Sequence, residues 1–183
     1  MKYYLILLVS TMMSFNLYSS SDIEKELLNQ LNLYRKKKGL ETMSLDSNLS
    51  TVAFSHANYL AKCKSVGHNT HYDKLPHDEQ FDISDHKEMD ADVRATTYPD
   101  CNMYAEISMQ TFSIDTAANI VTLCRSIIDQ FALSPKHNEI MTNDSEPNER
   151  FKLIVGISVI QVKSVIPKYN CYVVNIDFGV LVN

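Results

Sequence analysis

Hydrophobic residues recur with helical spacing in three segments of the chain. In the segments Ile23–Tyr34, Leu49–Ala61 and Ala117–Phe131, apolar residues lie mostly three and four positions apart. This spacing places the apolar side chains on one face of a helix, so it predicts three amphipathic helices. His56 lies on or beside the apolar face of the second segment, where a hydrogen-bonded core or boundary histidine is the expected role.

Capping and terminating residues flank these helical segments. Ser21 can cap the first helix, and the triple lysine followed by glycine at Lys36–Gly39 ends it. Asp46 or Ser47 can cap the second helix. Ser134-Pro135 ends the third, and we expect a short exposed turn to follow it from His137 to Met141.

Two strands are predicted near the end of the chain. Phe151–Val162 and Cys171–Val182 are rich in isoleucine and valine, and the linker Lys163–Asn170 suits a hairpin connection. The segment Lys62–Met103 has little apolar periodicity and holds four of the six histidines. The order helix, helix, loop, helix, strand, strand predicts an α+β fold or a layered α/β/α fold in a single domain.

The first residues have the pattern of a secretory signal peptide. Lys2 precedes the apolar run Tyr3–Val9, and the serines Ser19–Ser21 close the segment. A membrane anchor is the alternative, but the apolar run is shorter than the ~20 residues that span a bilayer. We therefore assign 1–20 to a signal peptide and 21–183 to a single domain. The sequence predicts a secreted protein, extracellular or periplasmic, with no transmembrane anchor after cleavage.

Composition excludes some classes of function. The chain has 183 residues with 17 basic and 22 acidic side chains, which gives a net charge of −5. This balance argues against nucleic-acid binding, which depends on many phosphate contacts. With only 4 glycines, the sequence contains no glycine-rich phosphate-binding loop.

The cysteine content suggests disulfide bonds. An exported chain with an even number of cysteines is expected to form two bridges, whose pairing the sequence leaves unknown. The alternative is that Cys124, on the apolar face of the third helix, is a small core residue. The four cysteines are Cys63, Cys101, Cys124 and Cys171.

Five short motifs, in order along the chain, resemble the CAP superfamily of cysteine-rich secretory proteins, antigen 5 and plant pathogenesis-related proteins, also called SCP-like domains. Five motifs in the family's order are a fairly specific signal, and the match as a whole spans roughly Leu27 to Gly179. The motifs are Asn32-x-x-Arg35-x-x-x-Gly39, Tyr104-Ala-Glu106-Ile107, Phe131-x-x-Ser134-Pro135-x-His137, Val155-Gly156 and Asp177-Phe178-Gly179.

The resemblance implies a three-layer α/β/α sandwich of the CAP (SCP-like) type with a surface cleft. In the family, this cleft gathers two histidines and acidic residues that can hold a divalent cation. Carried over to this chain, His137 and Glu106 take two of these positions. His71 fits the remaining histidine best, with His68 as the alternative.

The chain departs from the family pattern at several positions. Phe131 replaces the usual tryptophan and Ile107 the usual asparagine. The second acidic residue of eukaryotic members is absent near Ser134. The motifs therefore match the bacterial-type version of the family, with one carboxylate in the cleft.

Two imidazoles and a carboxylate suit a zinc ion with an open coordination position, or acid–base chemistry. Alternatively, Glu106 and His137 only hydrogen-bond to one another and hold the fold. The resemblance implies a non-enzymatic extracellular domain that binds a sterol, another lipid or a surface protein. A metal-assisted, peptidase-like hydrolase using His71, Glu106 and His137 is the alternative function, and a structural envelope protein is a third.

Overall fold

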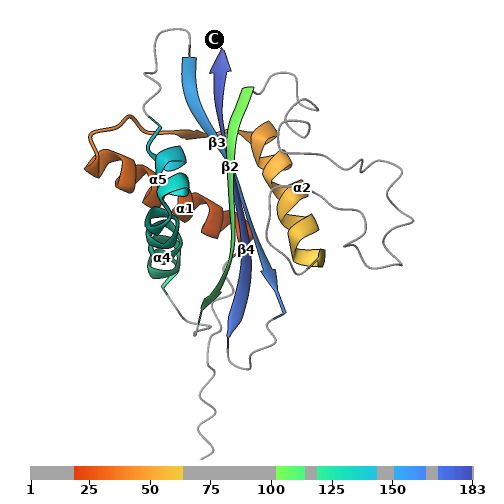
Figure 1. Cartoon of the computed structure of the whole chain (residues 1–183). Helices are drawn as coiled ribbons and strands as arrows, with labels where there is room; N and C mark the ends of the chain where they lie inside the picture. Colours follow the sequence, from red (N-terminus) through yellow and green to blue (C-terminus); the bar gives the residue numbers. More distant parts are fainter. Residues whose placement is uncertain (1–18, 64–101, 114–118, 144–150, 164–168, 183) are drawn as a thin grey trace, which may run out of the picture.

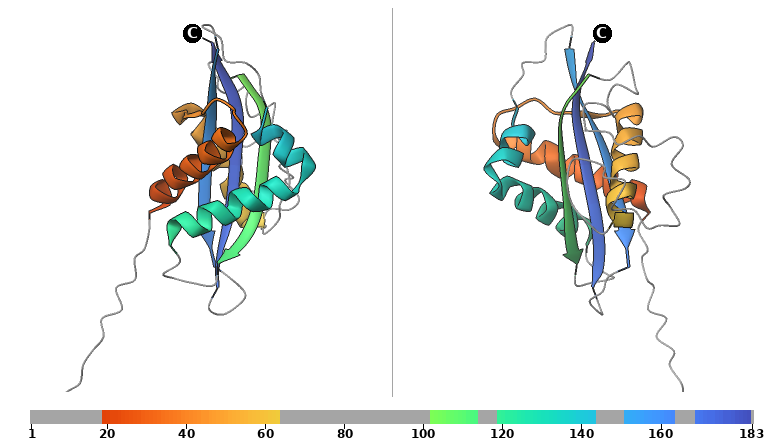
Figure 2. Two further views of the ribbon diagram at one scale, coloured as in Figure 1. Left: turned by 90° about the vertical axis from the view of Figure 1, so that its left-hand side faces the viewer. Right: turned by 45° about the vertical axis from the view of Figure 1, so that its right-hand side comes forward.

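The computed structural model describes residues 19–63, 102–113, 119–143, 151–163 and 169–182. In this part, a four-stranded sheet lies between two helical layers (Figure 1). Helices α1, α4 and α5 cover one face and α2 covers the other, as the views in Figure 2 also show. The predicted α+β fold with three α/β/α layers is confirmed. The elements are α1 (Ser20–Lys37), β1 (Ser44–Leu45), α2 (Ser47–Cys63), β2 (Asn102–Ser113), α4 (Ile120–Leu133), α5 (Pro135–Met141), β3 (Phe151–Val162) and β4 (Asn170–Val182).

The sheet is built around the hairpin of β3 and β4. The strand order is β1-β3-β4-β2, with β1 parallel to β3 and the other pairs antiparallel. The hairpin has the bounds that the sequence predicted, except that β4 begins one residue earlier, at Asn170. None of the helices in the described ranges is long and apolar enough to cross a membrane.

The sequence did not predict β2, the 12-residue strand at one edge of the described sheet. Its residues alternate between the two faces: Ile107 lies in the core under α1 and α4, while Glu106 and Ser108 face α2. A β-bulge between Met103 and Ala105 precedes this regular alternation. The segment Ala105–Gln110 alternates apolar and polar residues, which is the signature of a half-buried strand.

The N-cap of helix α1 lies two residues earlier than predicted. Ser19, rather than Ser21, is the N-cap, and it forms a capping box with Asp22. The helix ends at Lys37, and Gly39 adopts a left-handed conformation with φ of 77°. Glycine takes this conformation without a side-chain clash, so the predicted helix end is confirmed.

The residues from His137 to Met141, predicted as an exposed turn, instead belong to the short helix α5 (Pro135–Met141). Ser134 ends α4 and caps α5, with its Oγ 3.5 Å from the backbone nitrogen of His137. Pro135 occupies the first turn, where its missing N–H costs no hydrogen bond. Met141 is fully buried, which fixes the end of α5 on the core.

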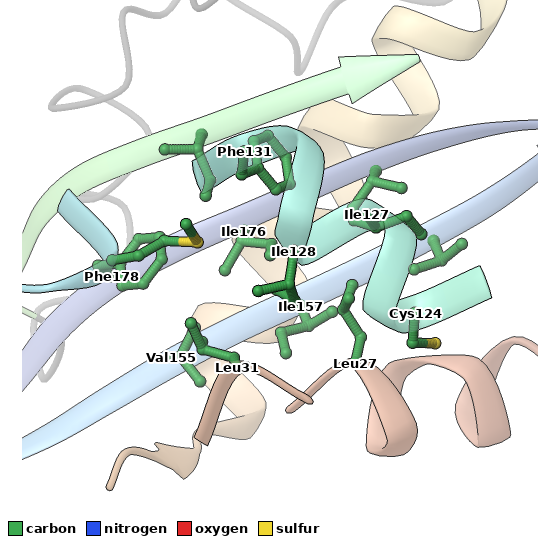
Figure 3. Close-up of a cluster of buried hydrophobic side chains, with 14 of the residues drawn as sticks. Leu27, Leu31, Cys124, Ile127, Ile128, Phe131, Val155, Ile157, Ile176 and Phe178 are labelled. Carbon is green, nitrogen blue, oxygen red and sulfur yellow. The ribbon is translucent and has the colours of Figure 1, made fainter. Parts of the chain in front are cut away.

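The main hydrophobic core lies between the sheet and the layer of α1 and α4 (Figure 3). Leu27 and Leu31 of α1 meet Ile127, Ile128 and Phe131 of α4 above the sheet. On the other face, α2 contributes smaller apolar clusters around Leu49 and Leu60. The predicted apolar faces of all three helices are therefore the ones that are buried.

The expectation of two disulfides is wrong, because Cys124 and Cys171 are free, buried cysteines. Cys124 of α4 points into the main core, and its Sγ is 3.5 Å from the carbonyl oxygen of Ile23. The alternative role for Cys124 as a core residue is confirmed. Cys171 accepts a hydrogen bond from Gln110 at 3.0 Å. The side chain of Cys63 and all of Cys101 lie outside the described residues, so a bridge between them stays a prediction.

We expect the denatured, unreduced protein to expose at least two thiols per chain, because Cys124 and Cys171 are free. Titration with a thiol reagent in denaturant measures this number, and the reduced protein, with all 4 cysteines available, is the control. Recovery of fewer than two thiols would contradict the structure.

Cys124 should also weaken the fold at alkaline pH. Burial, together with the nearby Glu26 carboxylate, raises the pKa of Cys124 from 9.0 to about 12. Between these values the unfolded chain loses a proton that the folded chain keeps. The free energy of unfolding therefore falls with rising pH, by up to about 1.4 kcal/mol per pH unit for this group. Burial also raises the pKa values of Tyr104 and Tyr172, which adds to the loss at higher pH.

The measurement is denaturant unfolding at a series of pH values for the wild type and for Cys124→Ala. The ordinary pKa of a cysteine thiol is 9.0. Above this pH, we expect the free energy of unfolding of Cys124→Ala to fall less steeply with pH than that of the wild type. Parallel curves for the two proteins would contradict the assignment.

Candidate functional site

Glu106, the acidic residue of the candidate site, is buried beneath α2. Its Oε1 lies 3.5 Å from Nε2 of His56, and the two side chains are 1% and 0% exposed. His56 comes from the apolar face of α2, and Glu106 reaches it from β2. The expectation that His56 is a buried core residue is confirmed, and its imidazole lies within ion-pair distance of the Glu106 carboxylate.

Two residues of β4 extend this group. Asn175 and Asp177 lie two positions apart on the face of β4 that is turned to α2, and both are 0% exposed. The amide nitrogen of Asn175 donates to Asp177 at 3.0 Å and to Glu106 at 3.5 Å. We call His56, Glu106, Asn175 and Asp177 the polar layer. One amide thus holds two carboxylates in place.

Ser158 of β3 adjoins the polar layer, because it is the register partner of Asn175. The Oγ of Ser158 and the Oδ1 of Asn175 are buried and have no hydrogen-bond partner among the described residues. Buried polar atoms of this kind are often bridged by an ordered water molecule.

The polar layer depends on how closely α2 approaches the sheet. A Cβ atom added to Gly156 of β3 would lie 2.2 Å from both the carbonyl carbon and the oxygen of Leu49 in the first turn of α2. Only glycine allows this contact between the two backbones. Gly156 is also the register partner of Asp177, so the close approach occurs beside the polar layer.

His137 lies in α5, on the opposite side of the sheet from the polar layer. Its ring meets Phe131 edge-on, with the ring centroids 5.4 Å apart, and Phe131 is part of the main core. Glu106 is turned to the α2 face of the same sheet. The structure therefore brings Glu106 to His56, and it places Glu106 and His137 on different faces.

The remaining histidines of the candidate site, His71 and His68, lie outside the described residues. Among the residues that the structure describes, no three His, Cys, Asp or Glu side chains are arranged to hold a metal ion. Glu106 and His137 do not fit a shared cation in their described positions, because the sheet lies between them. A zinc site that includes His71 or His68 stays a prediction.

The first sequence motif, Asn32 and Arg35, has a structural role. The side-chain amide of Asn32 donates to the carbonyl of Met43 at 2.9 Å and accepts from its N–H at 2.8 Å. Arg35 is 0% exposed and donates to the backbone carbonyls of Glu41, Met141 and Asn143. These bonds join α1 to the chain before β1 and to the end of α5.

Sequence reasoning missed Asn175 and Asp177 as members of the site. Asp177 belongs to the closing motif Asp177-Phe178-Gly179, which by itself assigns it no role in the site. The available signal was two polar residues at alternate positions of an otherwise apolar strand. Such a pair predicts that one face of the strand meets a buried polar group rather than a purely apolar layer.

Comparison with known proteins gives a family-level match. Residues 28–146 match the model of the cysteine-rich secretory protein family, CAP. No curated protein matches the chain by sequence.

Among solved structures, an outer surface protein from Borrelia burgdorferi is similar, with a TM-score of 0.55 and 17% identity over 88% of this chain and 95% of that one. A cysteine-rich secretory protein from Staphylococcus aureus has a TM-score of 0.46 and 16% identity, over 89% of this chain and 40% of that one. The first of these supports the fold.

Proposed function

Because the chain belongs to the cysteine-rich secretory protein (CAP) family, we propose that it is a secreted, non-enzymatic binding domain. Its ligand is a lipid or sterol, or a protein of a cell surface. Export rests on the signal-peptide pattern of residues 1–20, most of which lie outside the described residues.

The burial of Glu106 carries the non-enzymatic part of this proposal. A general acid or base must come within hydrogen-bond reach of its substrate. The side chain of Glu106 is 1% exposed, and its two oxygens face His56 and Asn175. This carboxylate therefore serves the fold, and binding has to use the surface of the domain.

The contact of His137 with Phe131 supports the same conclusion. The imidazole packs edge-on against a core ring, which is a stabilising aromatic geometry. Ser134, at the start of the same motif, is a helix cap. The Ser-Pro-x-His motif thus builds the junction between α4 and α5.

A peptide-turnover assay with and without zinc separates this proposal from the hydrolase alternative. We expect no zinc-dependent cleavage of a peptide library by the wild type above the level of the Glu106→Gln and His137→Ala variants. Zinc-dependent cleavage that both substitutions abolish, in variants that remain folded, would overturn the proposal and select the hydrolase.

A further inference from the structure

Helices α1 and α4 run side by side in the same direction, and their C-terminal ends lie beside α5 at one end of the helical layer (Figure 2). The Sγ of Cys124, early in α4, is 3.5 Å from the carbonyl oxygen of Ile23, early in α1. At the other end, the hydroxyl of Tyr34 donates to Asn138 of α5 at 2.5 Å. The last turns of α1 and α4 and the helix α5 therefore form one continuous region (Figure 2).

This region is rich in exposed lysines. We call the segments Leu33–Glu41 and Leu133–Asn143 the convergent end. It exposes the four lysines Lys36, Lys37, Lys38 and Lys136 against the two carboxylates Glu41 and Glu139. The chain as a whole carries a net charge of −5, so the positive charge of the convergent end stands apart from the rest.

Exposed leucines accompany these lysines. Leu133 is 84% exposed and Leu33 is 41% exposed, the former the most exposed large apolar side chain among the described residues. Leu33 shares a helix face with Lys36 and Lys37, which follow it by three and four positions. Lys38 lies over the ring of Tyr34, with Nζ 5.6 Å from the ring centroid.

We propose that the convergent end docks on a membrane surface that contains anionic phospholipids. The lysines supply attraction to the headgroups, which is worth roughly fivefold in binding per lysine near the surface. Leu133 supplies an apolar side chain that enters the boundary between headgroups and acyl chains. A soluble polyanion would engage the lysines alone, so the exposed leucines favour the membrane. This inference rests on the proposed binding function and names its ligand.

Vesicle sedimentation with the protein purified as exported tests the docking surface. The probes are vesicles of phosphatidylcholine alone and of phosphatidylcholine mixed with phosphatidylglycerol. We expect binding to the mixed vesicles that weakens with rising salt, because salt screens exposed charges. The double variant Lys36→Glu/Lys37→Glu should bind at least roughly 25-fold more weakly, by loss of two lysine contributions.

Two further variants keep the test specific. Lys25→Glu/Lys163→Glu makes the same change of charge at exposed positions outside the convergent end and should bind like the wild type. Leu133→Gln removes the most exposed leucine without affecting the core, and it should weaken binding roughly tenfold. All these proteins share one N-terminus, so the comparison between them is unaffected by residues 1–18.

Equal binding by the wild type and Lys36→Glu/Lys37→Glu would overturn the proposal. Binding to heparin but not to the mixed vesicles, unaffected by Leu133→Gln, would overturn it in favour of a polyanion. Neither result contradicts the proposed non-enzymatic binding function, because only zinc-dependent peptide cleavage in the turnover assay would overturn that function.

Discussion

Replacing Gly156 with alanine is expected to lower the free energy of unfolding by about 3 kcal/mol or more. The new Cβ would lie 2.2 Å from backbone atoms of Leu49, closer than any real contact allows. A backbone cannot rotate away as a flexible side chain does, so α2 has to move away from β3. That movement would also disturb the polar layer beneath the helix.

Denaturant unfolding of Gly156→Ala measures this effect, and Gly39→Ala is the matched control. An added Cβ at Gly39 meets nothing within 4 Å, but the residue has φ of 77°. The control should therefore lose only about 1 kcal/mol, from backbone strain. A Gly156→Ala protein as stable as the control would contradict the close approach of α2 and β3.

Replacing Arg35 with methionine should cost about 3 kcal/mol or more. The stem of the side chain stays filled by methionine, but the guanidinium donors are lost. The carbonyls of Glu41, Met141 and Asn143 then lose the donors that satisfy them inside the protein. Each buried group left without a partner costs roughly 1–3 kcal/mol.

Two control variants distinguish the loss of the Arg35 hydrogen bonds from the loss of a positive charge on α1. Lys37→Met makes the same loss of charge at an exposed position of α1 and should change stability by less than about 0.5 kcal/mol. Arg35→Lys keeps the charge, but a single ammonium group does not reproduce the planar fork that serves three carbonyls. It should therefore be nearly as unstable as Arg35→Met. Full stability of either Arg35 variant would show that these bonds do not hold α5.

Local patterns predicted the helices well, because burial on a single face leaves a direct periodic signal in α1, α2 and α4. Strands β3 and β4 are buried on both faces, and their runs of isoleucine and valine predicted them instead. Strand β2 was missed, although Ala105–Gln110 alternates apolar and polar residues. Its polar positions face a buried layer rather than solvent, and only the packing of α2 shows this.

The site was predicted less well for the same reason. His56 and Glu106 are 50 positions apart on a helix and a strand, and no local pattern pairs them. The motif residues Glu106 and His137 were grouped by family resemblance, but the alternation of β2 turns Glu106 away from α5. The disulfide expectation failed because a count of cysteines carries no information on which faces they occupy.

Glu106 is a structural partner of His56 in the polar layer. A double-mutant cycle in the free energy of unfolding, with His56→Ala and Glu106→Gln, measures their coupling directly. We expect a coupling of about 1–3 kcal/mol for this buried pair, and less than about 0.5 kcal/mol between Glu106→Gln and His137→Ala. Coupling of Glu106 to His137, with none to His56, would contradict it.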